Sequence, residues 1–202
     1  WLLLVLHGCK DAGKKEQFEL LSANQTGINF SNRLTATSEF NMFQYMYFYN
    51  GAGVGAGDFN QDGQIDLFFA SNQEQNRLYL NKGDFKFTDV TEQAQLPDDK
   101  GWSTGVSVVD INNDGLLDIY ICRVAGFENM KVGNQLLICQ GIKDGIPYYK
   151  DEAGYYGLAF SGFSTQASFF DYDLDGDLDC FLLNHSIHHN GTFGRRDRFL
   201  NT

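Results

Sequence analysis

The sequence has few basic residues and no hydrophobic run long enough to cross a membrane. Its 202 residues include 15 Lys and Arg against 26 Asp and Glu, which gives a net charge of -11. This charge argues against nucleic acid as a partner, because phosphates are bound by basic surfaces. The longest apolar run covers residues 1–6, well short of a transmembrane helix. A cation is the partner that the charge favours.

Proline and cysteine are also scarce, whereas glycine and aromatic residues are abundant. There are 2 Pro and 4 Cys against 22 Gly, 18 Phe and 10 Tyr. A hydrophobic content of 43% excludes a disordered chain. Aromatic side chains favour strands, so we expect a mostly β protein. Cys122, Cys139 and Cys180 lie in apolar runs without zinc-site spacing, and we expect them to be buried free thiols.

The fourth cysteine follows the apolar run at the start of the chain. Residues 6–9 (Leu-His-Gly-Cys) resemble a bacterial lipobox, which implies a lipid on Cys9. Residues 1–9 would then be the end of a signal peptide and 10–16 a tether. The expected product is an exported outer-membrane or cell-surface lipoprotein of a Gram-negative bacterium, held by its lipid alone. The alternative is a buried N-terminal strand in which Cys9 is incidental.

One nine-residue pattern, D-x-[DN]-x-D-G-x-x-D, occurs three times. The copies begin at Asp58, Asp110 and Asp171. Apolar or small residues precede and follow each copy, which predicts two strands joined by an acidic loop. A third strand is expected in each unit, and the first two units continue to a fourth. Four short strands in a unit of about 50 residues are typical of a β-propeller blade.

The fold class that we predict is all-β, a partial β-propeller with about two and a half four-stranded blades. The expected blades cover residues 51–101, 102–163 and 164–202, and the third is truncated. Residues 17–50 form a region before the first blade. Within it, residues 18–22 resemble the fourth strand of the first unit and are predicted to be an outer strand that closes the ring.

The acidic loops are predicted to bind about three Ca²⁺ ions. Ca²⁺ takes 6 to 8 oxygen ligands, which side chains at positions 1, 3, 5 and 9 and a carbonyl at position 7 can supply. The predicted side-chain ligands are Asp58, Asn60, Asp62 and Asp66, then Asp110, Asn112, Asp114 and Asp118, then Asp171, Asp173, Asp175 and Asp179. The predicted carbonyl ligands are those of Gln64, Leu116 and Asp177.

The acidic loops differ from an EF-hand at their position 12. An EF-hand has a Glu there, whereas these loops have Phe69, Ile121 and Leu182, so an EF-hand is excluded. A metal-free Asp/Asn/Gly turn is the remaining alternative for any single loop. Three such loops in the same register favour the metal.

With these loops, the sequence resembles the VCBS/FG-GAP repeat family, calcium-loop propellers related to the head of integrin α subunits. The segments 51–63 and 76–83 are especially similar to its bacterial branch, which often carries a downstream ASPIC/UnbV domain. The resemblance spans roughly residues 17–202 and implies a calcium-stabilised propeller. It also implies adhesion or binding at the cell surface.

One histidine cluster is not required by a generic blade. His185, His188 and His189 follow a predicted second strand, so they should lie at the end of the blade opposite the acidic loops. They are a possible ligand site or second metal site; a solvated loop is the alternative. Two aromatic runs, 45–49 and 155–156, are expected to pack between blades, although exposed rings would suit sugars.

The function that we predict is a non-catalytic module that binds or adheres to a protein or glycan. The sequence lacks G-x-S-x-G, P-loop and H-E-x-x-H motifs, and most clustered carboxylates are assigned to calcium. The alternative is a polysaccharide-active propeller enzyme, with catalytic residues outside this chain or in the loop from His185 to His189. A third possibility is an accessory part of a surface nutrient-uptake complex.

Overall fold

The computed structural model describes residues 18–126 and 130–185. Cys9, His188, His189, the signal and tether, and the third strand expected at 198–201 lie outside the described residues. The described part holds ten strands and one helical turn, α1 (Ala23–Thr26). The all-β prediction is therefore confirmed. No helix among the described residues is long and apolar enough to cross a bilayer.

The strands form three antiparallel sheets, each a simple up-and-down meander. Sheet 1 has the order β1-β2-β3-β4 and sheet 2 the order β5-β6-β7-β8, while sheet 3 pairs β9 with β10. The bounds in sheet 1 are β1 (Val54–Gly57), β2 (Asp66–Phe69), β3 (Arg77–Asn81) and β4 (Phe87–Asp89). Those in sheets 2 and 3 are β5 (Trp102–Val109), β6 (Asp118–Val124), β7 (Gln135–Lys143), β8 (Ile146–Asp151), β9 (Ser164–Phe170) and β10 (Asp179–Asn184).

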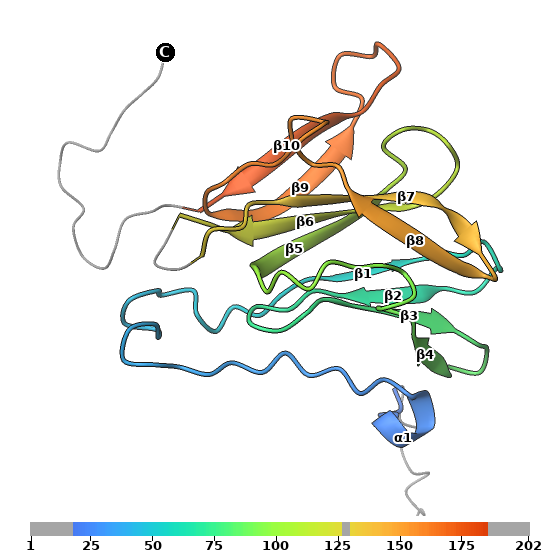
Figure 1. Ribbon diagram of the computed structural model, residues 1–202, viewed down its shortest axis with the longest axis horizontal. Helices are drawn as coiled ribbons and strands as arrows, with labels where there is room; N and C mark the ends of the chain where they lie inside the picture. Colours follow the sequence, from blue (N-terminus) through green and yellow to red (C-terminus); the bar gives the residue numbers. More distant parts are fainter. Residues whose placement is uncertain (1–17, 127–129, 186–202) are drawn as a thin grey trace, which may run out of the picture.

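The sheets stack in chain order, with sheet 2 between the other two (Figure 1). The first strands of successive sheets are in contact, β1 with β5 and β5 with β9. Repeated four-stranded meanders that pack face to face, with their first strands together, are the arrangement of propeller blades. The prediction of a partial propeller is confirmed.

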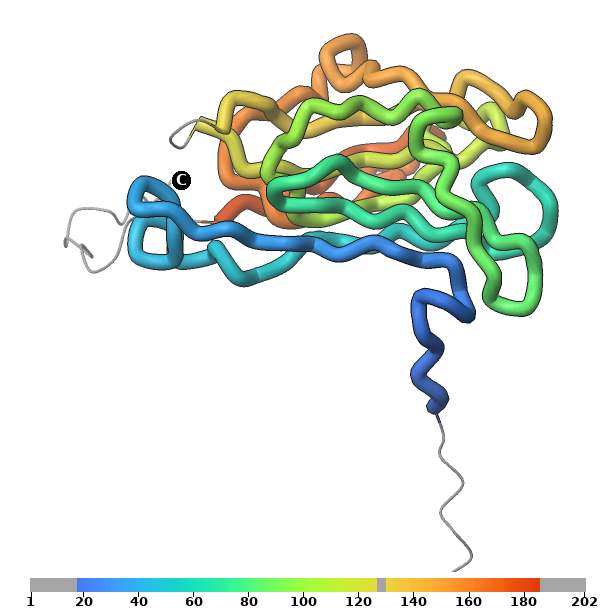
Figure 2. Tube along the Cα trace, turned by 60° about the horizontal axis from the view of Figure 1, so that its bottom comes forward, coloured from blue at the N-terminus to red at the C-terminus, as the bar shows by residue number. Residues whose placement is uncertain are grey.

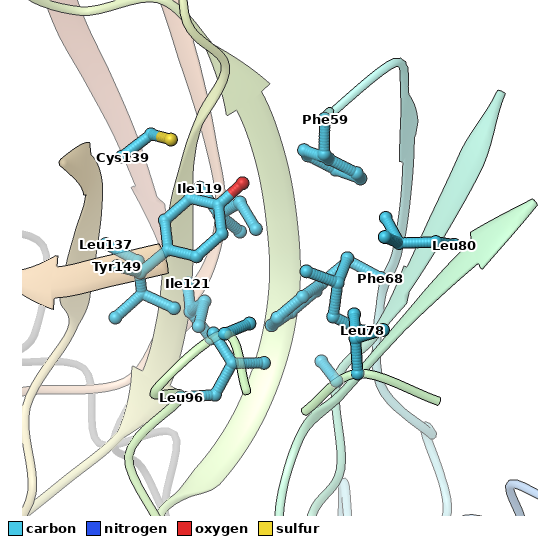
Figure 3. Packing of buried hydrophobic residues seen from close by; sticks show 13 residues of the cluster. Phe59, Phe68, Leu78, Leu80, Leu96, Ile119, Ile121, Leu137, Cys139 and Tyr149 are labelled. Carbon is cyan, nitrogen blue, oxygen red and sulfur yellow. The ribbon is translucent and has the colours of Figure 1, made fainter. Parts of the chain in front are cut away.

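Strand β6 is buried on both of its faces, which explains its unbroken apolar run. Ile119 and Ile121 belong to the core between sheets 1 and 2, where they face Phe68 (Figure 3). Tyr120 and Cys122 point the other way, into the core between sheets 2 and 3. Since successive side chains of a strand alternate between faces, a strand between two sheets favours a continuous apolar run, here residues 119–122.

The prediction of a strand at residues 18–22 is wrong. Residues 18–21 have no regular structure, and Phe18 and Leu20 are exposed. The backbone N–H of Ser22 donates to Oε1 of Gln25, the contact by which a Ser-x-x-Gln segment starts a helix. Among the described strands, none pairs with this segment.

Residues 28–37 are extended and run along sheet 1, as the blue segment in Figure 2 shows. The ring of Phe30 stacks on that of Phe69, with centroids 4.9 Å apart. Farther along, Asn32 donates from Nδ2 to Oδ1 of Asn72. The segment therefore covers the face of sheet 1 that points away from sheet 2.

Candidate functional site

The three acidic loops connect the first and second strands of their sheets, β1 to β2, β5 to β6 and β9 to β10. Because the sheets share one strand order, the loops emerge at the same end of the stack. Nε2 of Gln61 in the first loop donates to the carbonyl of Gly115 in the second, at 2.8 Å. The first and second loops are thus in direct contact.

The first loop is held by hydrogen bonds from its own backbone to its aspartates. Asp58 accepts from the N–H groups of Asp62 (2.9 Å) and Gly63 (2.8 Å). Asp62 in turn accepts from the N–H of Gln64 at 2.9 Å. The same bonds recur in the second loop at Asp110, Asp114, Gly115 and Leu116, and in the third at Asp171, Asp175, Gly176 and Asp177.

Two left-handed residues let each loop turn this tightly. Position 6 is a glycine with a φ of 85° to 97°, which the sequence pattern predicted. Position 4 is also left-handed, at Gln61, Asn113 and Leu174, with φ of 58°, 55° and 65°. The sequence did not predict the left-handed conformation of Leu174, because a leucine seldom adopts it.

The aspartate at position 9 has a structural role that the nine-residue pattern did not predict. Asp66 and Asp118 are fully buried. The two carboxylate oxygens of Asp118 accept from the N–H of Ile111 at 3.0 Å and of Cys139 at 2.8 Å. Asp66 makes the equivalent bonds to Phe59 and Asn81. This aspartate therefore ties the start of its loop to the third strand of the sheet.

Burial makes the charge on this aspartate costly. It raises the pKa of Asp118 to about 6, and the nearby charges of Asp114 and Asp110 act in the same direction, against the two backbone hydrogen bonds. Burial also raises the pKa of Asp66. A bound cation would oppose this effect, because a nearby positive charge favours the ionised carboxylate.

The third loop brings its carboxylates closest together. Asp171, Asp173 and Asp179 each place one oxygen within 4.8 Å of the others, a spacing that suits a shared metal ion. Position 3 of the first two loops is an asparagine. Its Nδ2 donates to the aspartate at position 5, from Asn60 to Asp62 and from Asn112 to Asp114. The third loop thus has one more carboxylate among its predicted ligands.

His185 lies at the other end of the stack, directly after β10. Its Nε2 and the hydroxyl of Tyr45 are 3.1 Å apart, and its backbone N–H donates to the carbonyl of Phe163. Its ring lies 4.3 Å from that of Tyr47. His185 is therefore part of an aromatic cluster.

The aromatic and cysteine predictions were mostly correct. Tyr45 and Phe48 are buried, as expected, and pack with Trp102. Tyr49 and Tyr155 are 64% and 86% exposed, so for them the prediction of packing between blades was wrong. All three described cysteines are free thiols; Cys122 and Cys139 are buried, and Cys180 is half-buried.

Comparison with known proteins finds a family model that matches part of this chain. Residues 58–121, which contain the first two loops, match the FG-GAP-like repeat family. The matched segment runs from the first acidic loop to the second, and the match agrees with the propeller-type arrangement of the sheets.

Two relatives are also similar over part of their length. Cartilage acidic protein 1 of Xenopus tropicalis is 28% identical over 104 residues, which cover 50% of this chain and 16% of that protein. Cartilage acidic protein 1 of Homo sapiens is 33% identical over 69 residues, 34% of this chain and 10% of that protein. The matched part is thus a small fraction of either relative.

Proposed function

We propose that the chain is a calcium-stabilised, non-catalytic binding module. The observation that supports this best is the hydrogen-bond frame shared by the three loops, which holds aspartates at corresponding positions in each. Carboxylate and carbonyl oxygens are the ligands that Ca²⁺ takes. One ion in each loop would give three in this chain.

The proposed role of calcium is structural. The ion would offset the repulsion among the aspartates of a loop, which grows as their oxygens approach. Through Asp66 and Asp118 it would also act on the third strand, to which these residues are hydrogen-bonded. Binding would therefore add to the free energy of unfolding.

The proposed partner is a protein or a glycan, bound at the end of the stack opposite the loops. The FG-GAP-like repeat supports a binding role. We also propose that the protein is exported and lipidated at Cys9, on the basis of residues 6–9. Labelling of bacterial cells with a fatty-acid analogue tests lipidation: Cys9→Ser should abolish the label, and a label that persists would contradict the proposal.

The calcium proposal is tested by counting bound ions in the full-length protein. After dialysis against calcium, we expect the double variant Asp171→Asn/Asp173→Asn to hold one ion fewer than the wild type. The matched control is Asp144→Asn, since Asp144 is an exposed acid on the turn between β7 and β8. Equal calcium contents for the wild type and the double variant would contradict a site in the third loop.

A further inference from the structure

A cavity of about 310 Å³ lies at the end of the stack opposite the acidic loops. Residues around the starts of the three first strands form one side, including Gly53 before β1, Thr104 and Gly105 in β5, and Gln166 in β9. Its volume is near the lower limit for small-molecule sites, about 300 Å³. The cavity is therefore large enough for one small ligand.

Glycine makes this part of the cavity possible, because the strands approach too closely for a side chain. A Cβ on Gly105 would lie 2.2 Å from both the carbonyl oxygen of Thr165 and Oε1 of Gln166. A Cβ on Gly53 would lie 2.7 Å from the backbone nitrogen of Val106. Backbone thus comes to the cavity surface at these positions.

Aromatic rings form another side. Tyr45 and Trp102 are buried, and Tyr47 is half-buried beside them. The rings of Tyr45 and Trp102 meet edge to face at 5.8 Å, and His185 contacts both tyrosines. These contacts hold Tyr47 at the cavity, where its remaining exposed surface is available to a ligand.

Apart from the imidazole of His185, the polar side chains around the cavity carry amides and hydroxyls. Gln166 donates from Nε2 to the carbonyl of Val106 and to Oγ of Ser107, both at 3.2 Å, so its carboxamide has a fixed orientation. The hydroxyl of Thr104 donates to the carbonyl of Ser164 at 2.8 Å and keeps acceptor capacity. No Asp, Glu, Lys or Arg lies among the described residues that line the cavity.

We propose that this cavity binds a single neutral saccharide ring. A sugar ring has an apolar C–H face that suits Tyr47 and hydroxyls that suit the carboxamide of Gln166 and the hydroxyl of Thr104. The proposal rests on the binding role proposed above and names its site and ligand class. An anionic sugar is disfavoured, because the described cavity lining has no Lys or Arg and the chain has a net charge of -11.

Calorimetric titration of the full-length, calcium-loaded protein tests the proposal. The probes are neutral monosaccharides (a hexose, an N-acetylhexosamine and a 6-deoxyhexose) and one uronic acid. We expect saturable binding of at least one neutral sugar and weaker binding of the uronic acid. Tyr47→Ala should raise the Kd about tenfold, which corresponds to about 1.4 kcal/mol, because it removes the aromatic contact with the sugar.

The matched control is Tyr155→Ala, because Tyr155 is exposed and does not line this cavity. If Tyr47→Ala does not fold, Gln166→Ala replaces it, as Gln166 is exposed. An unchanged Kd in the cavity variant, or tighter binding of the uronic acid, would overturn the proposal. The absence of any sugar binding would also overturn the proposal. If the protein still bound calcium and the same face captured a protein, the function proposed above would survive. Loss of the calcium effect alone would overturn the role of calcium and not the sugar site.

Discussion

At the scale of single residues, the aspartates of the acidic loops have different roles. Asp118 is buried and accepts two backbone hydrogen bonds, one from a strand 21 residues later in the chain. Asp173 is exposed, and its carboxylate lies with those of Asp171 and Asp179. The sequence pattern predicted both residues as ligands. Only the three-dimensional structure shows that Asp118 also links its loop to the third strand.

Removing these two side chains should therefore have different effects on stability in EDTA. Asp118→Ala leaves the buried N–H of Cys139 and the partly buried N–H of Ile111 without an acceptor, and we expect it to lower the free energy of unfolding by about 3 kcal/mol. Asp173→Ala should leave stability unchanged or raise it, because it relieves repulsion. Urea unfolding in EDTA measures both. Equal losses in the two variants would contradict the distinct roles.

A second residue-scale feature is an ion pair between a buried arginine of sheet 2 and a partly exposed aspartate in the segment before it. The guanidinium of Arg123, 1% exposed, donates to both oxygens of Asp99, at 2.7 and 2.8 Å. The pair fixes residues 97–101 against β6. Neither position stood out in the sequence, since the partners are 24 residues apart and form no motif.

Asp99→Ala should lower the free energy of unfolding by about 3 kcal/mol, because it leaves a buried guanidinium without its counter-charge. The matched control is Lys150→Ala, which breaks the ion pair to Glu152 from a mostly exposed lysine. We expect the control to change stability by less than about 1 kcal/mol. A loss for Asp99→Ala no larger than that of the control would show that the pair is not structurally important.

At the scale of elements, the apolar runs predicted most strands because a strand that is buried on both faces favours consecutive apolar residues. The run from Ile119 to Cys122 is one case, and it forms the middle of β6. The prediction failed at residues 18–22. This segment resembles a fourth strand in sequence, but none of the described strands pairs with it. Whether a segment forms a strand depends on the strands beside it, and the local sequence does not show which strands those are.

The contact between β5 and β9 gives an element-scale prediction. Gly105→Ala would place a methyl group 2.2 Å from the carbonyl of Thr165, and backbone there cannot move aside without separating the strands. We expect Gly105→Ala to lower the free energy of unfolding by about 3 kcal/mol or more. Gly154→Ala is the control, because nothing lies within 4 Å of its added Cβ. Thermal unfolding compares the two, and equal melting temperatures would contradict the close approach.

At the scale of the whole molecule, the burial of a sheet depends on how many described sheets pack against it. Sheet 2 has a described sheet on each side, and all seven residues of β6 are buried. Sheet 3 has a described neighbour on one side only, and Phe181 and Leu183 of β10 are 61% and 51% exposed. The sheets are thus stabilised mainly by each other, and the acidic loops lie together at one end of this stack.

The most direct test of the central claim is the melting temperature of the full-length protein in EDTA and across a calcium titration. Elemental analysis should first confirm that the EDTA-treated sample is metal-free. At calcium 100-fold above its Kd, each loop should add about 2.7 kcal/mol. The melting temperature should then rise by more than about 10 °C, with a smaller rise in magnesium. An unchanged melting temperature between metal-free and calcium-saturated protein would contradict the claim that calcium stabilises this fold.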